Sequence, residues 1–576
     1  MMLIGLSSLV ILLPGSYFWS LQYQPLFFQV MILVISLSCL IYYRKRFKVQ
    51  YSVLDILTFV SVLYVLVNNR TGNLSVFNPI LTYLALFFLI KHVITENKKL
   101  YFPVTVFIFL GVLNCFIAIL QLGNVYPIVF RPYVITGLFA NPAQLAGFIT
   151  AILPFSLYNA RSKGIIWIPV IILFISIIII SGSRAALFSS TIVIVIAGLH
   201  SIRFLQKKSA AKIFTLIALF FILCCFLYVL YQFRTSSADG RFLIWKAGYS
   251  MFTDSPLFGQ GASSFVKDYA LYQAKFFNAG FGTSDEILLA RNASYVFNEF
   301  LHIAIEEGIT GLLLFISIIY RITTIFNKNK DSANLYIGMS TLSMIIFGLF
   351  SYPADSSTIN FVFIFCLAYY ASKDQAHNLP NAIKVYLFAI AATILFILNV
   401  TVSFTILEIM KWQRADKSWN IDESNAIELY RDLEPVLCYK PEFMYNYLSQ
   451  LTSFHYYEDA IKLYTKYGMR FNNSTDLLLQ LGYCYEKSAH SLKAEHYYKL
   501  ASSITPGLLL PKFYLLNLYI ASNEHIKAAA IAKQLISMPV KVQNTNTDHI
   551  IKTAYDYLYS PDKKPALILN SDTKHR

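Results

Sequence analysis

The chain has 576 residues, of which 56% are hydrophobic and only 14% are charged. Soluble domains carry about 25% charged residues, so this composition excludes an ordinary soluble protein and a disordered one. The net charge is +16, and most of the excess lies in residues 1–410, which hold 27 Lys and Arg against 14 Asp and Glu. Because these basic residues fall between apolar runs, they indicate membrane topology and not a nucleic-acid surface.

Apolar runs long enough to cross a hydrocarbon core of about 30 Å recur up to residue 403. We predict thirteen transmembrane helices, at residues 2–20, 25–43, 51–67, 77–93, 101–122, 143–158, 164–181, 185–200, 213–232, 298–320, 334–352, 357–371 and 383–403. The first run has no basic segment before it and no small-residue cleavage site. We therefore expect it to be a retained helix and not a signal peptide.

Basic residues are distributed unevenly over the short loops between these runs. The loops after every second run hold 18 Lys and Arg, whereas the intervening short loops hold only Arg70, Arg131 and Arg184. Cytoplasmic loops carry the excess of Lys and Arg, so the N-terminus is predicted to be cytoplasmic. With thirteen spans, the long loop 233–297 and all residues after 404 are then expected on the opposite side.

The C-terminal part changes to a mixed-charge, Tyr-rich, amphipathic pattern. Three alanines recur at intervals of 34 residues, at Ala460, Ala494 and Ala528. This period resembles the tetratricopeptide repeat, a helix–turn–helix unit. We predict a helical repeat domain at 420–576, joined by a linker at 404–419, that folds apart from the chemistry and holds a protein partner. A plain helical bundle is the alternative.

The sequence lacks the short motifs of several enzyme classes. It has no phosphate-binding G-x-x-x-x-G-K-[ST] motif, and no Asp-x-Asp, His-x-x-x-His or Cys-x-x-Cys. We therefore predict no metal and no cofactor. The seven cysteines show no regular spacing, although Cys438 and Cys484 are candidates for a disulfide. The predicted fold class is all-α, a polytopic membrane protein (1–403) with an extracytoplasmic repeat domain.

Five polar signatures occur at the predicted outer ends of the spans. They are Ile135–Ala146, Ser181–Ala185, Gly240–Lys246 with Asp254–Gly261, Asn298–Gly311 and Ser351–Pro353. In this order and spacing they resemble the O-antigen ligase and polymerase superfamily, which includes bacterial protein O-oligosaccharyltransferases. The resemblance covers about residues 100–355. It implies a metal-independent, inverting transfer of a preassembled glycan from an undecaprenyl-diphosphate carrier to a hydroxyl, at the outer face of the bacterial inner membrane.

Two arginines suit such a donor. Arg184 begins a predicted helix after Gly182, and Arg241 begins the helix of the long loop after Gly240. Arginine binds phosphate oxygens through two parallel hydrogen bonds, and the diphosphate gains negative charge as the glycosidic bond breaks. We therefore predict that both are catalytic. Anchoring of the two side chains at the membrane interface is the alternative.

The base for the acceptor hydroxyl is not defined by the motif. The superfamily has His-Asn where this chain has Phe297-Asn298. We predict His302 and Glu306 as catalytic replacements, with Asp285 and Glu299 as further candidates for the base, because ionisable residues in a span are expected to face a polar cavity. Pairing between helices is the alternative. The signatures also supply six predicted substrate-binding residues, namely Asn141, Ser183, Gly240, Trp245, Asn298 and Glu299.

Three kinds of acceptor are compatible with this predicted function. The repeat domain favours a ligase that uses lipid A core or a protein Ser/Thr, and a polysaccharide polymerase is the alternative. A polysaccharide or lipid transporter would have two related halves with charges at the membrane midplane, and the sequence shows no such halves. The expected partners are the lipid-linked donor, the acceptor, membrane lipids and a protein bound by the repeats, but no nucleic acid.

Overall fold

The computed structural model describes residues 24–43, 50–69, 77–97, 101–128, 133–201, 235–329, 331–378, 380–468, 473–540 and 543–559, and a few positions between 222 and 232. The described chain is almost entirely α-helical, as predicted; its strands are the short antiparallel pair β1 (Gln50–Tyr51) and β2 (His377–Asn378). It forms two compact units. The first holds described residues up to Thr235, Phe252–Ser263 and Tyr295–Arg414, and the second holds the others.

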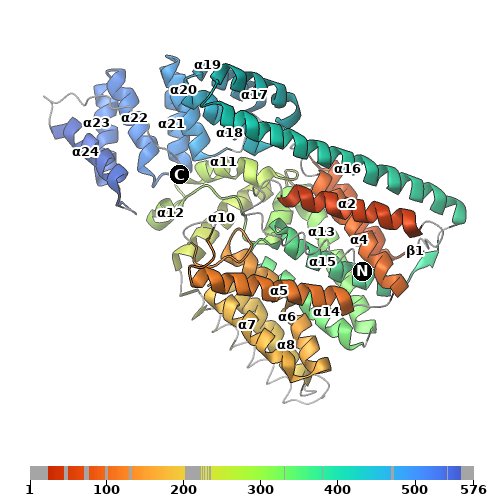
Figure 1. Ribbon diagram of the computed structural model, residues 1–576. Helices are drawn as coiled ribbons and strands as arrows, with labels where there is room; N and C mark the ends of the chain where they lie inside the picture. The colour runs from red at the N-terminus through yellow and green to blue at the C-terminus, as the bar shows by residue number, and fades with distance from the viewer. Residues whose placement is uncertain are drawn as a thin grey trace. The chain divides into compact units, whose positions relative to one another are not determined.

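The first unit contains the apolar helices. In chain order they are α2 (Gln24–Tyr43), α3 (Val53–Val67), α4 (Phe77–Asn97), α5 (Tyr101–Leu122), α6 (Pro142–Lys163), α7 (Ile168–Ile180), α8 (Arg184–Ser201), α13 (Glu299–Lys328), α14 (Ser332–Gly348), α15 (Ser357–Lys373) and α16 (Asn381–Ser418) (Figure 1). Each predicted span within the described residues coincides with one of them. The predicted spans 2–20 and, except for a few positions, 213–232 lie outside the described residues.

Four helices of the described chain are long and apolar enough to cross a membrane by themselves, through segments Phe77–Thr95, Pro103–Leu122, Glu299–Lys328 and Ala389–Ser418. The other apolar helices are shorter or more polar. Helix α6 shows why a polar helix fits here, because it is surrounded by α5, α7, α8, α14 and α15 and is buried over most of its length. The total of thirteen spans therefore stays a prediction.

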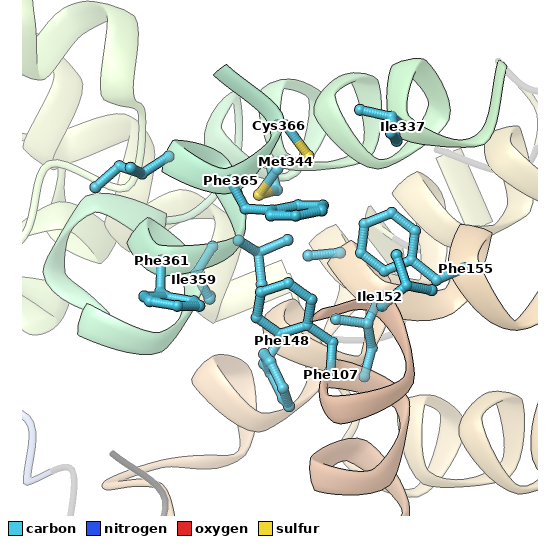
Figure 2. Packing of buried hydrophobic residues seen from close by; sticks show 14 of the residues in the cluster. Phe107, Phe148, Ile152, Phe155, Ile337, Met344, Ile359, Phe361, Phe365 and Cys366 are labelled. Atoms are coloured by element: carbon cyan, nitrogen blue, oxygen red, sulfur yellow. The ribbon is translucent and has the colours of Figure 1, made fainter. Parts of the chain in front are cut away.

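Aliphatic, aromatic and small residues make the core of the first unit. The Phe107 ring lies between the rings of Phe155, Phe361 and Phe365, at centroid distances of 6.1, 5.5 and 5.4 Å (Figure 2). Small residues let α6 and α14 approach closely: the Ser340 hydroxyl donates to the Ala151 carbonyl at 2.6 Å. A Cβ on Gly147 would lie 2.7 Å from the Phe347 ring. Such close packing is expected inside a membrane. Lipid tails are as apolar as the side chains, so helices associate through van der Waals contacts and hydrogen bonds.

Ion pairs fasten one end of the helices in the first unit. Lys91 pairs with Asp55, and Arg321 pairs with Asp374, whose carboxylate also accepts from the Leu54 N–H at 3.1 Å. All four charged side chains are largely buried, except that Arg321 is about one-fifth exposed. Basic residues that predict the orientation thus also hold helix ends together. The orientation itself remains a prediction.

The second unit is built from helix pairs. Its C-terminal helices are α17 (Glu423–Leu437), α18 (Pro441–Ser453), α19 (Tyr457–Tyr467), α20 (Thr475–Lys487), α21 (Ser491–Ile504), α22 (Leu509–Ala521), α23 (His525–Ser537) and α24 (Thr545–Tyr559). The helices α18, α20 and α22 begin 34 residues apart, and so do α19, α21 and α23. Each alanine of the 34-residue series is fully buried on a second helix. Neither Cys438 nor Cys484 forms a disulfide, so the candidate disulfide is absent.

Most of the long loop, residues 236–251 and 264–294, belongs to the same unit as the repeats. The loop forms α10 (Thr235–Asp254), α11 (Ser264–Asn278) and α12 (Ser284–Leu289). Ala270 and Ala274 of α11 share a hydrophobic core with the repeat helices, and the Gln273 amide donates to the Ile504 carbonyl at 2.7 Å. The expectation that the repeats fold apart from the rest stays a prediction, and this shared core argues against it. The segment predicted as a linker, 404–419, is also helical, because α16 continues to Ser418.

This shared unit constrains the topology. Residues 264–294 and the chain after 415 must lie on the same side of a membrane, because they form one compact unit. Four helices of the first unit, α13 to α16, separate the two segments along the chain. If the chain crosses the membrane an even number of times between residue 294 and residue 415, both segments lie on the same side. The sequence predicts four spans in this interval, which is an even number.

Candidate functional site

The start of α13 brings three predicted site residues together. Asn298 caps the helix, its side-chain oxygen accepting from the Leu301 N–H at 3.0 Å. His302 lies between two carboxylates on neighbouring turns, with Nδ1 3.5 Å from Glu299 Oε2 and Nε2 3.3 Å from Glu306 Oε1. Glu299 in turn accepts from the Ala354 N–H at 2.9 Å, which fixes it to the segment before α15. The spacing i, i+3, i+7 places all three on one helix face.

A cavity of about 270 Å³ opens at this face. Its polar end holds Glu299, His302, Glu306 and Glu307. The remaining walls are mainly apolar, from Phe300, Ile303, Phe315, Met344, Ile345, Ile359 and Phe363. Three carboxyl groups against one imidazole make this end suited to accepting a proton and unfavourable for a phosphate anion.

Helix α13 is interrupted at Gly308, two residues after Glu306. Gly308 has φ +67° and ψ −169°, a conformation that essentially only glycine adopts. The segment Pro256–Gly261 fills the break through backbone hydrogen bonds: Gln260 and Gly261 N–H donate to the carbonyls of Ile305 and Glu306 at 2.9 and 2.8 Å. Ile309 N–H donates to the Pro256 carbonyl at 2.8 Å. Two sequence signatures are therefore one structural element.

Two residues that the sequence reasoning missed support the break. Asn68 donates to the Phe258 carbonyl at 2.6 Å and to Glu307 Oε2 at 3.0 Å. The Tyr64 hydroxyl donates to the Glu307 carbonyl at 2.8 Å. The available signal was a polar pair, four residues apart, at the end of an otherwise apolar run. Sequence alone gives no reason to connect that pair with α13.

Replacing Gly308 by alanine is expected to destabilise the first unit by about 3 kcal/mol or more. The new Cβ would lie 2.5 Å from backbone atoms of Leu257 and Gly259, which cannot move without breaking the hydrogen bonds above. Thermal unfolding of the detergent-solubilised protein measures the loss. Gly198→Ala is the control, because a Cβ on Gly198 of α8 meets nothing within 4 Å. Equal unfolding temperatures for the two variants would contradict the interlocked break.

The first signature is held by buried amides of α5. Gln121 Oε1 accepts from the N–H groups of Thr136 and Gly137 at 2.8 and 2.9 Å, and Asn114 Oδ1 accepts from Leu138 N–H at 3.0 Å. Asn141 then caps α6 by accepting from Gln144 N–H at 2.9 Å. These polar residues shape the segment that leads into α6. Asn141, predicted to bind substrate, uses its side-chain oxygen as a helix cap.

The second signature forms the turn between α7 and α8. Gly182 has φ +65°, and the Ser183 hydroxyl accepts from Ala186 N–H at 3.4 Å, so Ser183 caps α8. Arg184 is the first residue of α8 and is partly exposed. It lies in the first unit and does not line the cavity at α13, whereas Arg241 lies on α10 in the second unit. The prediction that Arg241 begins its helix is wrong, because α10 already starts at Thr235.

Phe297 occupies the position of the superfamily's histidine. It has φ +58°, and its ring packs edge-on against Tyr352 at 5.2 Å, while Tyr295 and Tyr352 stack at 4.0 Å. A phenyl ring cannot accept a proton. A base at this end of α13 would therefore come from its neighbours, and Glu299, His302 and Glu306 are the candidates on the helix.

Trp245 of α10 and Asp285 of α12 line the same groove in the second unit, which has a volume of about 690 Å³. Gly240 lies on α10 with no atom within 4 Å of where its Cβ would be. Glu286, beneath Asp285, accepts from Lys246 Nζ at 2.6 Å and from Thr283 N–H at 3.0 Å. Burial alone would raise the pKa of Glu286, but these donors hold it below its usual value. The carboxylate is therefore charged at neutral pH.

The described residues contain no group of three or more His, Cys, Asp or Glu side chains arranged to hold a metal. Residues 169–316 match the family model of the O-antigen ligases. The matched segment contains Arg184, Arg241, His302 and Glu306, together with the Gly308 break. No curated protein matches the chain significantly. With the apolar helices, this match supports a membrane glycosyltransferase of the O-antigen ligase and polymerase superfamily.

Proposed function

We propose that the protein is an O-antigen ligase-like glycosyltransferase. It moves a preassembled glycan from an undecaprenyl-diphosphate carrier to an acceptor hydroxyl, on lipid A core or on a protein Ser/Thr, at the outer face of the inner membrane. The observation that carries the proposal is the Glu299–His302–Glu306 cluster at the polar end of an apolar cavity, inside the segment that matches the ligase family.

The cluster activates the acceptor. His302 Nε2 or Glu306 takes the proton of the acceptor hydroxyl, and the oxygen forms its new bond to the anomeric carbon of the first sugar. The bond from that carbon to the carrier's diphosphate breaks, and the electron pair leaves on the diphosphate. Attack from the opposite face inverts the anomeric carbon. Glu299 holds the imidazole from its other nitrogen and so sets its orientation.

The arginines stabilise the leaving group. The carboxylate-rich end of the cavity repels a diphosphate, so the donor's anion requires a separate cationic site. Arg184 begins α8, Arg241 lies six residues after the start of α10, and both are inside the matched segment and always charged. The proposed mechanism needs no metal, because the two guanidinium groups neutralise the charge that the diphosphate gains.

The second unit serves acceptor recognition in this proposal. Its 34-residue helix pairs resemble tetratricopeptide repeats, which bind protein partners along their surface. With the N-terminus in the cytoplasm, this unit lies in the periplasm, on the side where the lipid-linked glycan is consumed. The repeats therefore favour a protein acceptor or a protein partner, whereas a polymerase would use the end of a growing glycan.

His302→Gln and Glu306→Gln are expected to lower glycan transfer at least about 100-fold, because each removes a proton acceptor while keeping a similar shape. The measurement is transfer from a purified lipid-linked oligosaccharide in proteoliposomes, with lipid A core and unfolded periplasmic protein offered as acceptors. His377→Gln, at an exposed position of β2 in the first unit, is the control. Binding of the donor should be unchanged in all three variants. Full activity in both cluster variants would refute the assigned roles.

A transporter is the second candidate, because α13 is interrupted and carries ionisable residues near the break. In transporters such breaks surround the substrate, whereas here the backbone of Pro256–Gly261 occupies the break. The same proteoliposomes separate the two functions. Movement of intact lipid-linked glycan without a new glycosidic bond would establish transport and overturn the proposed enzyme.

A further inference from the structure

Helix α10 exposes an aromatic stripe. Phe242, Trp245 and Tyr249 occupy positions i, i+3 and i+7, so they share one face of the helix. Phe242 is 47% exposed and Tyr249 is 61% exposed. The other face buries Leu243, Ala247, Gly248 and Met251. The helix is therefore attached to its unit mainly through this other face. Trp245 is half-buried and the rings on either side of it are exposed, and such a row of large aromatic side chains indicates a binding surface.

Helix α12 provides a polar wall opposite this stripe. Thr283 and Glu286 form a capping box, and Glu286 is fixed by its ion pair with Lys246 of α10 at 2.6 Å. Asp239, Asp285 and Leu289 complete the lining of the groove, whose volume of about 690 Å³ is within the range of small-molecule and oligosaccharide sites. The capping box fixes the first turn of α12, and the ion pair joins α12 to α10.

The chemistry of the lining selects a class of ligand. Aromatic faces pack against the apolar faces of sugar rings, and carboxylates accept hydrogen bonds from sugar hydroxyls. The lining contains three carboxylates and one lysine, and that lysine is already paired with Glu286. This excess of negative charge disfavours uronic acids and phosphorylated sugars, and also the anionic headgroups of a membrane surface.

We propose that the groove between α10 and α12 binds uncharged sugar units of a glycan, next to the carrier's diphosphate. Arg241 directly precedes Phe242 on the same helix but does not line the groove, and consecutive helix residues point about 100° apart, so a diphosphate held by Arg241 lies beside the aromatic stripe. This inference rests on the proposed function for the identity of the carrier. The assignment of uncharged sugars rests on the lining of the groove alone.

The test compares two ligands on the full-length protein in nanodiscs. One is undecaprenyl diphosphate carrying a neutral trisaccharide, and the other is undecaprenyl diphosphate without sugar. Trp245→Ala is expected to weaken binding of the glycan-bearing ligand about tenfold and to leave binding of the bare carrier unchanged. Arg241→Ala is expected to weaken both. Phe281→Ala is the control, because Phe281 is 70% exposed in the same unit and does not line the groove.

If Trp245→Ala weakened the binding of both ligands equally, or of neither, the groove would not be a glycan-binding site. Binding of a carrier with a uronic-acid trisaccharide as tightly as the neutral one would overturn the assignment to uncharged sugars. Because these readouts are equilibrium binding, they stand even if the protein transfers no glycan, and failed transfer alone would count only against the proposed function.

Discussion

Replacing Arg184 by alanine is expected to lower glycan transfer by about 100- to 1,000-fold, the usual effect of removing one fixed donor from a developing anion. Arg184 is the first residue of α8 and follows a turn formed by Gly182 and Ser183. The backbone of this turn therefore fixes the position of its Cα. Donor binding should weaken less than turnover, because the diphosphate gains charge only as the glycosidic bond breaks. Arg241→Ala is expected to behave in the same way.

The controls separate charge from geometry. Arg184→Lys keeps the charge but loses the planar pair of donors, so it should recover little of the transfer rate. Arg291→Ala removes an exposed arginine in the loop after α12 and should leave transfer unchanged. Initial rates and donor affinity are measured on the same preparations, with folding checked by gel filtration. Full activity in both Arg184→Ala and Arg241→Ala would make these arginines interface anchors and remove the proposed donor site.

Ending the chain after residue 410 is expected to unfold the long loop as well as the repeats. The deletion removes the core that covers Ala270 and Ala274, the Ile504 carbonyl that Gln273 donates to, and Thr475, which donates to Asn292. Residues 264–294 should then become sensitive to limited proteolysis, and binding of the donor glycan should be lost with the loop.

A shorter deletion is the control for this result. Ending the chain after Ser537 removes α24 but keeps α20 and α21, on which α11 packs. The loop should then keep most of its resistance to protease. If the chain ending at 410 retained a protected loop and full donor binding, the repeats would be separable after all, and the shared core would contribute little to the stability of the loop.

Several features of this protein follow from its sequence. Apolar runs set the helices of the first unit, and the alanines at 34-residue intervals set the period of the helix pairs, because both patterns arise from local helix geometry. The signatures also located the cluster at the start of α13. Glu299, His302 and Glu306 lie on one face of a helix, so their spacing was sufficient to bring them together.

Only the tertiary structure decided the rest, since it depends on contacts between residues far apart in the chain. Asn141, Ser183 and Asn298 have the residue types of a polar site, but each is used as a helix cap. The break at Gly308 requires the backbone of Pro256–Gly261, and its support by Asn68 comes from α3, about 240 residues away. The loop and the repeats share one core because α11 needs apolar partners that its own segment does not supply. No local pattern encodes such pairings, because burial is a property of the whole chain and not of a sequence window.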